Sequence, residues 1–457
     1  MFSNRLVSSS VPPARPHRLT SGYLSWLCLA LLGYALLGKG FAYLGVRPLY
    51  IGEVSMILGL GVLAVSGRST AYVLRSPIMW LLTITALWGA VRTVPYIPTL
   101  GVVALRDAVL WGYGIFAVIV AALLVEKPTR LRLLLRRYQR FVVLFVGLIW
   151  LVHLVTRLAP GLVPHLPGAP VPLAYLKAGD VQVHLGGAAV FLLLGMARAR
   201  YWVVLLLLAE LFVGGVYNRG GFVAAGMAVA VTLLLKPSLG RKLPRLAVGM
   251  GGLLLLLVAI DPVIPSEGRA ISLQQIQRNV ASIFSDSHGT GGLQNTKEWR
   301  LNWWGDIFEY TVAGPHFWTG KGFGVNLANS DGYQVTYNES LRSPHNAHVT
   351  MLARAGVPGF LLWTLLHLTW LVQMLRAYVR SAHRDEHTWS NVFLFLIAYW
   401  TAFMTNASFD VFLEGPMGGI WFWVLFGVGV GALQIYRKRP EVLGSHTTDA
   451  ARPRLLS

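Results

Sequence analysis

The sequence predicts an all-α polytopic membrane protein with about twelve transmembrane helices and one large helical loop between the ninth and tenth helices. Of its 457 residues, 55% are hydrophobic and only 13% are charged, whereas soluble proteins carry about 25% charged residues. Apolar runs recur from Gly22 almost to Arg437, and a helix needs roughly 20 such residues to cross a bilayer. A single soluble core does not explain so many runs.

Twelve apolar segments are expected to span the membrane. They cover approximately residues 22–43, 49–66, 77–95, 108–125, 141–157, 181–197, 201–217, 220–235, 246–262, 357–379, 390–408 and 416–436. Between the fifth and sixth, residues 158–180 are rich in Pro and Gly, which predicts a surface segment without regular structure.

The distribution of basic residues predicts the orientation of these spans. Lys and Arg gather in alternate connections and in both tails; examples are Arg68, Arg75, Arg130, Arg137, Arg200, Arg241, Arg380, Arg15 and Arg439. Because cytoplasmic loops carry the excess of Lys and Arg, both termini are expected to be cytoplasmic. The net charge of +20 is therefore interpreted as topology rather than as a nucleic-acid surface, and no nucleic-acid partner is expected.

The same pattern divides the chain into five parts. These are a cytoplasmic tail over 1–21, an N-terminal bundle of nine spans over 22–262, an outer loop domain over 263–345, C-terminal spans over 346–436 and a cytoplasmic tail over 437–457. The first tail lacks a cleavable signal pattern and is expected to be retained. Within the outer loop, the stretch "NTKEWRLNWWGDIFEY" predicts a helix capped at Asn295 with Glu298 as its capping partner. Its aromatic side chains are expected to rest on the membrane interface.

Metal and nucleotide sites find little support in the sequence. Cys28 is the only cysteine and lies in the first apolar run, which excludes a disulfide framework and a cysteine-based metal site. "GKGFG" does not fit the Gly-x4-Gly-Lys-[Ser/Thr] pattern of a phosphate loop, and no strand is predicted before it. The outer acids are expected to pair with outer arginines rather than to bind a metal; they are Glu53, Asp107, Asp306 and Glu309. No metal and no cofactor is expected.

Two arginines on the outer side are candidates for binding an anion. Arg219, in "VYNRGGFVAAG", lies in a short turn where Gly220 and Gly221 permit close backbone approach. Its alternative role is that of a snorkelling arginine at a helix end. Arg300 lies on the helix of the outer loop, where a solvated helix face is the alternative.

A histidine precedes the tenth span, in "SPHNAHVTMLARAGVPGFLLW". A short helix is expected to begin after His345 and to stop at Gly356 in the left-handed conformation, with Pro358 starting the next helix. At this position His345 can accept a proton from a hydroxyl group. A structural hydrogen bond is the alternative, and His348 is a second candidate for the base.

These residues resemble the O-antigen ligase and polymerase superfamily of polytopic bacterial glycosyltransferases. His345, Asn346, Gly356 and Gly359 fit its His-[Asn/Ser/Gln]-x9-Gly-x-x-Gly signature. "NRGGFV", "EWRLNWW" and "GKGFG" resemble further family motifs, and together these pieces cover roughly residues 200–430. Asn218 stands where the family has serine, and Val223 stands where ligases have leucine.

The resemblance implies transfer of a glycan from undecaprenyl diphosphate to a sugar hydroxyl of lipid A-core, in lipopolysaccharide biosynthesis. It implies a multi-pass protein of the bacterial inner membrane, in contact with membrane lipids, whose active site faces the periplasm. Arg219 and Arg300 are then expected to hold the diphosphate while His345 acts as the base. Residues expected to bind substrate are Lys39, Arg47, Arg92, Arg106, Asn346, His348 and Lys321.

Other functions remain open at this point. A polymerase uses the same donor but extends the lipid-linked chain, and a protein-directed oligosaccharyltransferase differs only in its acceptor. A transporter or flippase of lipid-linked glycans predicts functional charges near the bilayer midplane and two similar halves. A structural scaffold predicts that Arg219, Arg300 and His345 can be replaced without effect.

Overall fold

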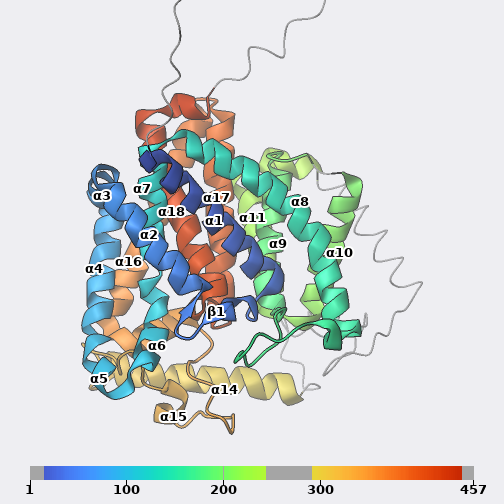
Figure 1. The fold of residues 1–457 in the computed structure, drawn as a ribbon. Helices are drawn as coiled ribbons and strands as arrows, with labels where there is room; N and C mark the ends of the chain where they lie inside the picture. Colours follow the sequence, from blue (N-terminus) through green and yellow to red (C-terminus); the bar gives the residue numbers. More distant parts are fainter. Residues whose placement is uncertain (1–14, 199, 243–290, 445–457) are drawn as a thin grey trace, which may run out of the picture.

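Long helices make up most of the computed structural model, which describes residues 15–198, 200–242 and 291–444 (Figure 1). The prediction of a mostly helical protein is confirmed over these residues. The predicted span over 246–262 and residues 263–290 of the predicted outer loop lie outside the described residues.

A helix occupies each predicted span whose residues are described. The bundle helices are α1 (Arg15–Leu37), α2 (Ile51–Val65), α3 (Gly67–Leu74), α4 (Pro77–Val91), α6 (Val102–Gly112), α7 (Ile115–Glu126), α8 (Thr129–Leu158), α9 (Ala178–Leu193), α10 (Tyr201–Tyr217), α11 (Arg219–Leu235), α16 (Ala347–His383), α17 (His387–Ala407) and α18 (Pro416–Lys438). Shorter elements connect them: η1 (Phe41–Tyr43), the antiparallel strands β1 (Gly45–Val46) and β2 (Leu49–Tyr50), η2 (Val94–Tyr96), α5 (Ile97–Leu100), η3 (Pro160–Leu162), η4 (Pro237–Lys242), η6 (Phe412–Glu414) and η7 (Pro440–Val442).

By length and composition, five described helices can cross a membrane, or seven if each bent pair counts as one span. The bent pairs are α2 with α3, at 97°, and α6 with α7, at 42°. Helices α9, α10 and α11 are apolar but shorter, and a helix of fewer than roughly 20 residues does not reach across the hydrocarbon layer on its own. The number twelve therefore stays a prediction.

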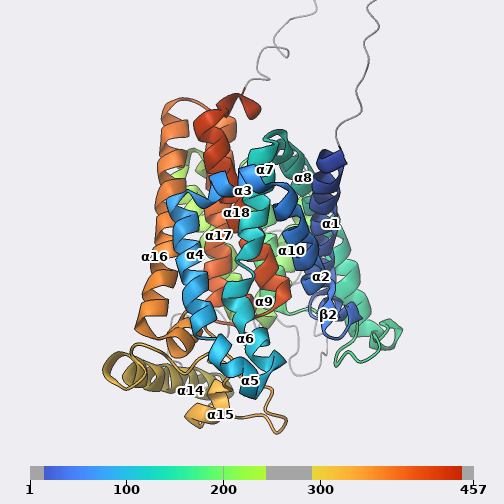
Figure 2. The same ribbon diagram turned by 60° about the vertical axis from the view of Figure 1, so that its left-hand side comes forward.

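Contacts join the connections predicted to be cytoplasmic at one end of the bundle. Arg130, at the start of α8, donates a hydrogen bond to Thr20 near the start of α1. Lys438, at the end of α18, lies over the ring of Tyr72 in α3, with Nζ 3.9 Å from the ring centroid. Both figures accordingly place the start of α1 and the end of α18 at the same end (Figures 1 and 2).

The connections predicted to be outer meet at the opposite end. The backbone N–H of Lys39, after α1, donates to the carbonyl of Tyr175, before α9. Asp107 in α6 forms an ion pair with Arg342 at 2.9 Å and another with Arg354 at 3.0 Å. Asp107 thus pairs with outer arginines, as expected.

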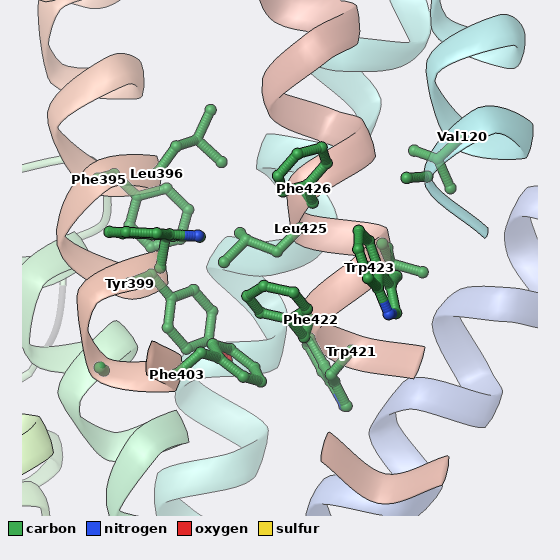
Figure 3. Close-up of a cluster of buried hydrophobic side chains, with 14 of the residues drawn as sticks. Val120, Phe395, Leu396, Tyr399, Phe403, Trp421, Phe422, Trp423, Leu425 and Phe426 are labelled. Carbon is green, nitrogen blue, oxygen red and sulfur yellow. The ribbon is translucent and has the colours of Figure 1, made fainter. Parts of the chain in front are cut away.

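The centre of the bundle is packed with aromatic side chains. Figure 3 shows Tyr399 and Phe403 of α17 and Phe422 and Phe426 of α18 filling the space between these two helices. Trp423 is 1% exposed, and its indole donates to the carbonyl of Leu110. Burying such large rings supplies the stabilisation that holds α17 and α18 in place.

A separate helical layer covers the outer end. It contains α14 (Gly291–Phe308), a π-helical turn (Glu309–Ala313) and α15 (Leu327–Asp331), and α14 runs across the end of the bundle (Figure 2). The cap expected at Asn295 is wrong, because the helix already includes Gly291. Trp303 and Ile307 are fully buried against α15 and the start of α16, so this face packs on protein and not on a membrane interface. On other faces of the helix, Leu301 and Phe308 are half exposed.

Candidate functional site

The turn between α17 and η6 brings three distant parts of the chain together. Nδ1 of His345, before α16, lies 3.6 Å from Oδ1 of Asp410. Nζ of Lys177, before α9, lies 3.6 Å from the same oxygen. Nη1 of Arg300 donates a hydrogen bond to the carbonyl of Phe409, the residue before Asp410, at 3.0 Å. A carboxylate is therefore surrounded by an imidazole, an ammonium and a guanidinium.

His345 is held in an uncommon backbone conformation. Its φ is 55°, in the left-handed region, which a non-glycine residue occupies at a cost of about 1–3 kcal/mol. Asn346 follows as the N-cap of α16, and its side-chain oxygen accepts hydrogen bonds from the backbone of His348 and Val349. The cap fixes where the helix begins, so the imidazole projects from the residue just before it.

Asp410 is mostly buried and charged. Burial raises the pKa of its carboxyl, but the adjacent His345, the Lys177 ammonium and the N–H of Val411 outweigh this effect and hold the pKa at about 2. Burial also lowers the pKa of Lys177, but the charges of Asp410 and Asp180 exceed that effect and raise it. The carboxylate and the ammonium stabilise each other, so both are charged at neutral pH.

Arg300 reaches this turn from α14. Besides the bond of its Nη1 to Phe409, its Nε is buried and has no hydrogen-bond partner among the described residues. Burial lowers the pKa of the guanidinium, the charge of Asp410 raises it and the charge of Arg219 lowers it, with a net decrease. Two guanidiniums thus lie within electrostatic range of each other, an arrangement that an anion between them stabilises.

Arg219 is the first residue of α11, at the same turn. Asn218 caps the helix by accepting a hydrogen bond from the N–H of Gly221 at 2.8 Å. Asn and Ser are about equally good N-caps, so Asn218 performs the capping that a serine at this position would perform. A Cβ on Gly220 would lie 2.9 Å from Cβ of Phe409, so the glycine lets the start of α11 approach the turn that carries Asp410.

Two hydrogen bonds fix the outer layer and the His345 segment to the bundle. The indole of Trp304, one turn after Arg300, donates to the carbonyl of Pro344 at 2.8 Å. The hydroxyl of Thr350 donates to Oε1 of Glu414 at 2.8 Å. Desolvation of the Glu414 carboxyl raises its pKa, while Arg354, Ser343 and Thr350 act in the opposite direction. These bonds tie both sides of His345 to fixed elements.

The glycines of the signature have a packing role. Gly356 has φ 67° and ψ −175°, so it kinks α16 in an extended positive-φ conformation and not in the left-handed helical conformation that was expected. A Cβ there would lie 2.5 Å from the carbonyl oxygen of Phe317. The "GKGFG" segment wraps around this kink, since the N–H groups of Lys321 and Gly322 donate to the carbonyls of Ala353 and Arg354. The segment is therefore structural support for the start of α16.

His348 is engaged inside the protein. Its Nδ1 accepts a hydrogen bond from the indole of Trp363 at 3.1 Å, and its ring also bonds to the backbone of Met404. His345, by contrast, faces Asp410 through Nδ1. The geometry thus distinguishes the two histidines, with His345 beside the charged cluster and His348 in the packing of α16 against its neighbours.

The other basic residues expected to bind substrate fall into two groups. Burial and the charges of Lys177 and Arg106 lower the pKa of Lys39. Lys39 is therefore within electrostatic range of Lys177, which belongs to the cluster, and of Arg106. Arg47 is exposed in the hairpin of β1 and β2, and no described contact connects it with His345.

Arg92 and Lys321 make contacts within the outer layer. Nε of Arg92 donates to the carbonyl of Thr319 at 2.6 Å. Nζ of Lys321 forms an ion pair with Asp331 at 2.6 Å and lies 4.4 Å from the ring centroid of Tyr310. Through these interactions both side chains stabilise the "GKGFG" segment. None of the interactions indicates a role in binding substrate.

Sequence reasoning missed Asp410 and Lys177. Asp410 follows a predicted span in "NASFDVFLEG", and Lys177 ends the Pro- and Gly-rich segment. An acid in a very short outer connection was the available signal for Asp410. Beside it, Asp180 and Asn406 are buried, and they keep side-chain atoms without hydrogen-bond partners among the described residues. The polar cluster therefore continues into the bundle.

Comparison with known proteins identifies one family. Residues 202–364 match a family model described as O-antigen ligase. The match runs from α10 into α16, so it contains Arg219, Arg300 and His345 but neither Lys177 nor Asp410. No curated protein matches the chain. Over the described residues, no group of three or more His, Cys, Asp or Glu side chains could hold a metal ion.

Proposed function

We propose, from the premise that the chain belongs to the O-antigen ligase and polymerase superfamily, that it transfers a glycan from undecaprenyl diphosphate to a sugar hydroxyl of lipid A-core. The observation that carries this proposal is the convergence of Arg219, Arg300 and His345 on the turn at Asp410. The family match supports the reaction class. The positions of the side chains support the separate roles that we assign to the two arginines and to His345.

The two arginines are assigned to the diphosphate of the donor. A diphosphate is already stable as an anion, so its departure needs positive charge on its oxygens more than it needs a proton. Guanidinium groups are always charged and bind such oxygens in a planar fork. The buried Nε of Arg300, which lacks a partner among the described residues, and the N-terminus of α11 at Arg219 are suited to this task.

His345 is assigned the proton of the acceptor hydroxyl. In the proposed step the acceptor oxygen bonds to the anomeric carbon, the bond between that carbon and the diphosphate oxygen breaks, and the hydroxyl proton passes to Nε2 of His345. Asp410 faces Nδ1, so it orients the ring and stabilises the imidazolium that forms. Attack opposite the leaving group inverts the anomeric centre, and NMR of the product that showed retention would contradict this step.

The orientation of the chain follows from the same proposal. Undecaprenyl tails stay in the hydrocarbon layer while their diphosphate lies at headgroup depth. The cluster lies at the end of the bundle that carries α14 and α15, opposite the start of α1 and the end of α18 (Figure 1). With the basic connections in the cytoplasm, this end faces the periplasm of a bacterial inner membrane.

The decisive experiment measures glycan transfer by the purified protein with a lipid-linked donor and lipid A-core. Replacement of Arg219, Arg300 or His345 by alanine is expected to lower the rate by about a hundredfold or more in each case. Wild-type rates in all three variants, with wild-type stability, would reject the proposal.

Lipopolysaccharide from a deletion strain distinguishes the ligase from a polymerase. Loss of all O-antigen with an unmodified core is the expected result. A core that carries a single repeat would instead assign the chain to the polymerases, which share the donor chemistry and differ in the acceptor.

A further inference from the structure

A cavity of about 400 Å³ lies between α1, α8, α17 and α18, and no residue of the His345 cluster lines it. Its walls are almost entirely apolar; among them are Leu31, Phe141, Phe395, Trp421 and Leu425. Four of the lining residues, Phe395, Tyr399, Trp421 and Leu425, are labelled in Figure 3. Leu29 of α1 and Leu144 of α8 line the cavity and are 65% and 47% exposed, so the cavity opens sideways between these two helices, where lipid surrounds a membrane protein.

Two arginines interrupt the apolar lining of the cavity. Arg137 and Arg140 of α8 lie between apolar lining residues that extend from Leu131 to Leu144. Arg137 donates to Oγ of Ser25 at 2.6 Å and lies 3.6 Å from Sγ of Cys28. Within the described part of the chain, no Asp or Glu lines the cavity, so the two positive charges are not compensated by an acid in the described wall. The cavity therefore combines an apolar lining with a cationic patch on α8.

The dimensions of the cavity match one leaflet of a bilayer. Its lining on α8 extends from Leu131 to Leu144 and on α18 from Trp421 to Val428, which at 1.5 Å per residue corresponds to roughly 10–20 Å along the helix axes. Half of a hydrocarbon core of about 30 Å has a similar depth. An apolar chain that enters between α1 and α8 can thus lie along the apolar lining while its phosphate reaches the arginines on α8.

We infer that this cavity binds one acyl chain of an anionic phospholipid whose phosphate contacts Arg137 and Arg140. The glycan donor is a poorer occupant, because its diphosphate is assigned to the opposite end of the bundle. Arg130, two turns before Arg137, contacts Thr20 at the start of α1, whereas His345 lies at the end that carries α14. The choice of a phospholipid over the glycan donor rests on the proposed function, whereas the cavity and its arginines are features of the structure that do not depend on it.

The test is native mass spectrometry of the purified full chain with phosphatidylglycerol or phosphatidylcholine of identical acyl chains. The wild type is expected to bind phosphatidylglycerol at least about tenfold more tightly, since hydrogen bonds to charged groups are the strong ones. The double variant R137Q/R140Q is expected to lose this preference. R136Q is the matched control, because Arg136 lies on the same helix, is exposed and does not line the cavity. V428W, which fills the cavity without changing its charge, is expected to weaken binding of both lipids at least tenfold.

A second measurement uses the unmodified protein. Cys28 is the only cysteine and lines the cavity, so bound phosphatidylglycerol is expected to slow its alkylation by a maleimide several-fold, and phosphatidylcholine is expected to slow it less. Equal protection by both lipids, equal loss of binding in R136Q and R137Q/R140Q, or unchanged binding in V428W would each overturn the inference. Displacement of phosphatidylglycerol by undecaprenyl phosphate, read by native mass spectrometry as loss of the bound phospholipid while Cys28 stays protected, would also overturn it and assign the cavity to an isoprenoid chain.

Discussion

The imidazole of His345 and the carboxylate of Asp410 face each other at the outer end of the bundle, with Nδ1 3.6 Å from Oδ1. His345 precedes α16 and Asp410 follows α17, so the pair exists only when these two helices are packed together. Asp410 is held in turn by Lys177. A charged carboxylate behind an imidazole fixes the orientation of the ring and favours its protonated form during the reaction.

Asp410→Asn is expected to lower kcat about tenfold to a hundredfold with little change in KM, whereas His345→Ala is expected to cost 10²–10⁴-fold. The double variant should be no slower than His345→Ala alone, because Asp410 acts through the histidine. Rates across pH with purified donor and acceptor check this. Asp306→Asn is the control, since Asp306 contacts Tyr333 in the outer layer. Independent, additive losses at 345 and 410 would contradict the pairing.

Arg219→Lys and Arg300→Lys are each expected to lower kcat/KM for the donor by about tenfold to a hundredfold, although the charge is retained. A lysine ammonium lacks the planar fork that binds two phosphate oxygens. Kinetics at varied donor concentration provide the measurement. Lys297→Gln, on the same helix as Arg300, is the matched control and should leave kcat/KM within twofold. Full activity in the lysine variants would show that positive charge alone, without the planar fork, is sufficient for the donor diphosphate.

The pKa of Asp410 predicts a pH dependence of stability. The pKa falls from 3.8 to about 2 on folding, so the carboxylate contributes on the order of 2 kcal/mol above pH 3.8. This contribution is lost as the pH falls from 3.8 towards 2. The difference in thermal unfolding temperature between the wild type and Asp410→Asn in detergent should therefore be constant at neutral pH and shrink in that acid range. A difference that grows on acidification has the wrong sign for this account.

Gly356→Ala is expected to destabilise the protein by several kcal/mol and to reduce activity. Alanine is strained at φ 67°, and its Cβ would lie 2.5 Å from the carbonyl of Phe317. Gly305→Ala is the matched control: Gly305 lies within α14, and a Cβ added there would meet no described atom within 4 Å, so alanine should be neutral or stabilise by about 0.5–1 kcal/mol. Thermal unfolding of both variants measures the contrast, and equal effects would remove the role assigned to the kink.

The apolar runs predicted the helices well, because length and hydropathy are local properties of the sequence. The helix boundaries were less predictable. The spacing of Asn295 and Glu298 predicts a cap at Asn295, yet α14 begins at Gly291, because a capping pattern in the sequence does not by itself stop the helix from extending further. The sequence also predicts that the aromatic side chains of α14 rest on the membrane interface, whereas Trp303 is buried in protein. Its packing partners in α15 and α16 lie far away in the sequence, so the local pattern does not reveal them.

The candidate site was predictable only where residue spacing carries information. Arg219, Arg300 and His345 each belong to a short motif. Lys177 and Asp410 belong to none, and they reach the site through the packing of α9 and α17. Arg354 also shows this limit, because it is an outer arginine by sequence but is 1% exposed and paired with Asp107.

Arg300 belongs to a layer that is seated on the bundle, while Arg219 and Asp410 belong to the bundle itself. Next to the cluster, two hydrogen bonds hold this layer against the bundle. Arg300 donates to the carbonyl of Phe409, and Trp304 donates to the carbonyl of Pro344. Under the proposed function, an anion bound by both guanidiniums would connect this layer to the bundle, and release of the diphosphate would remove that connection.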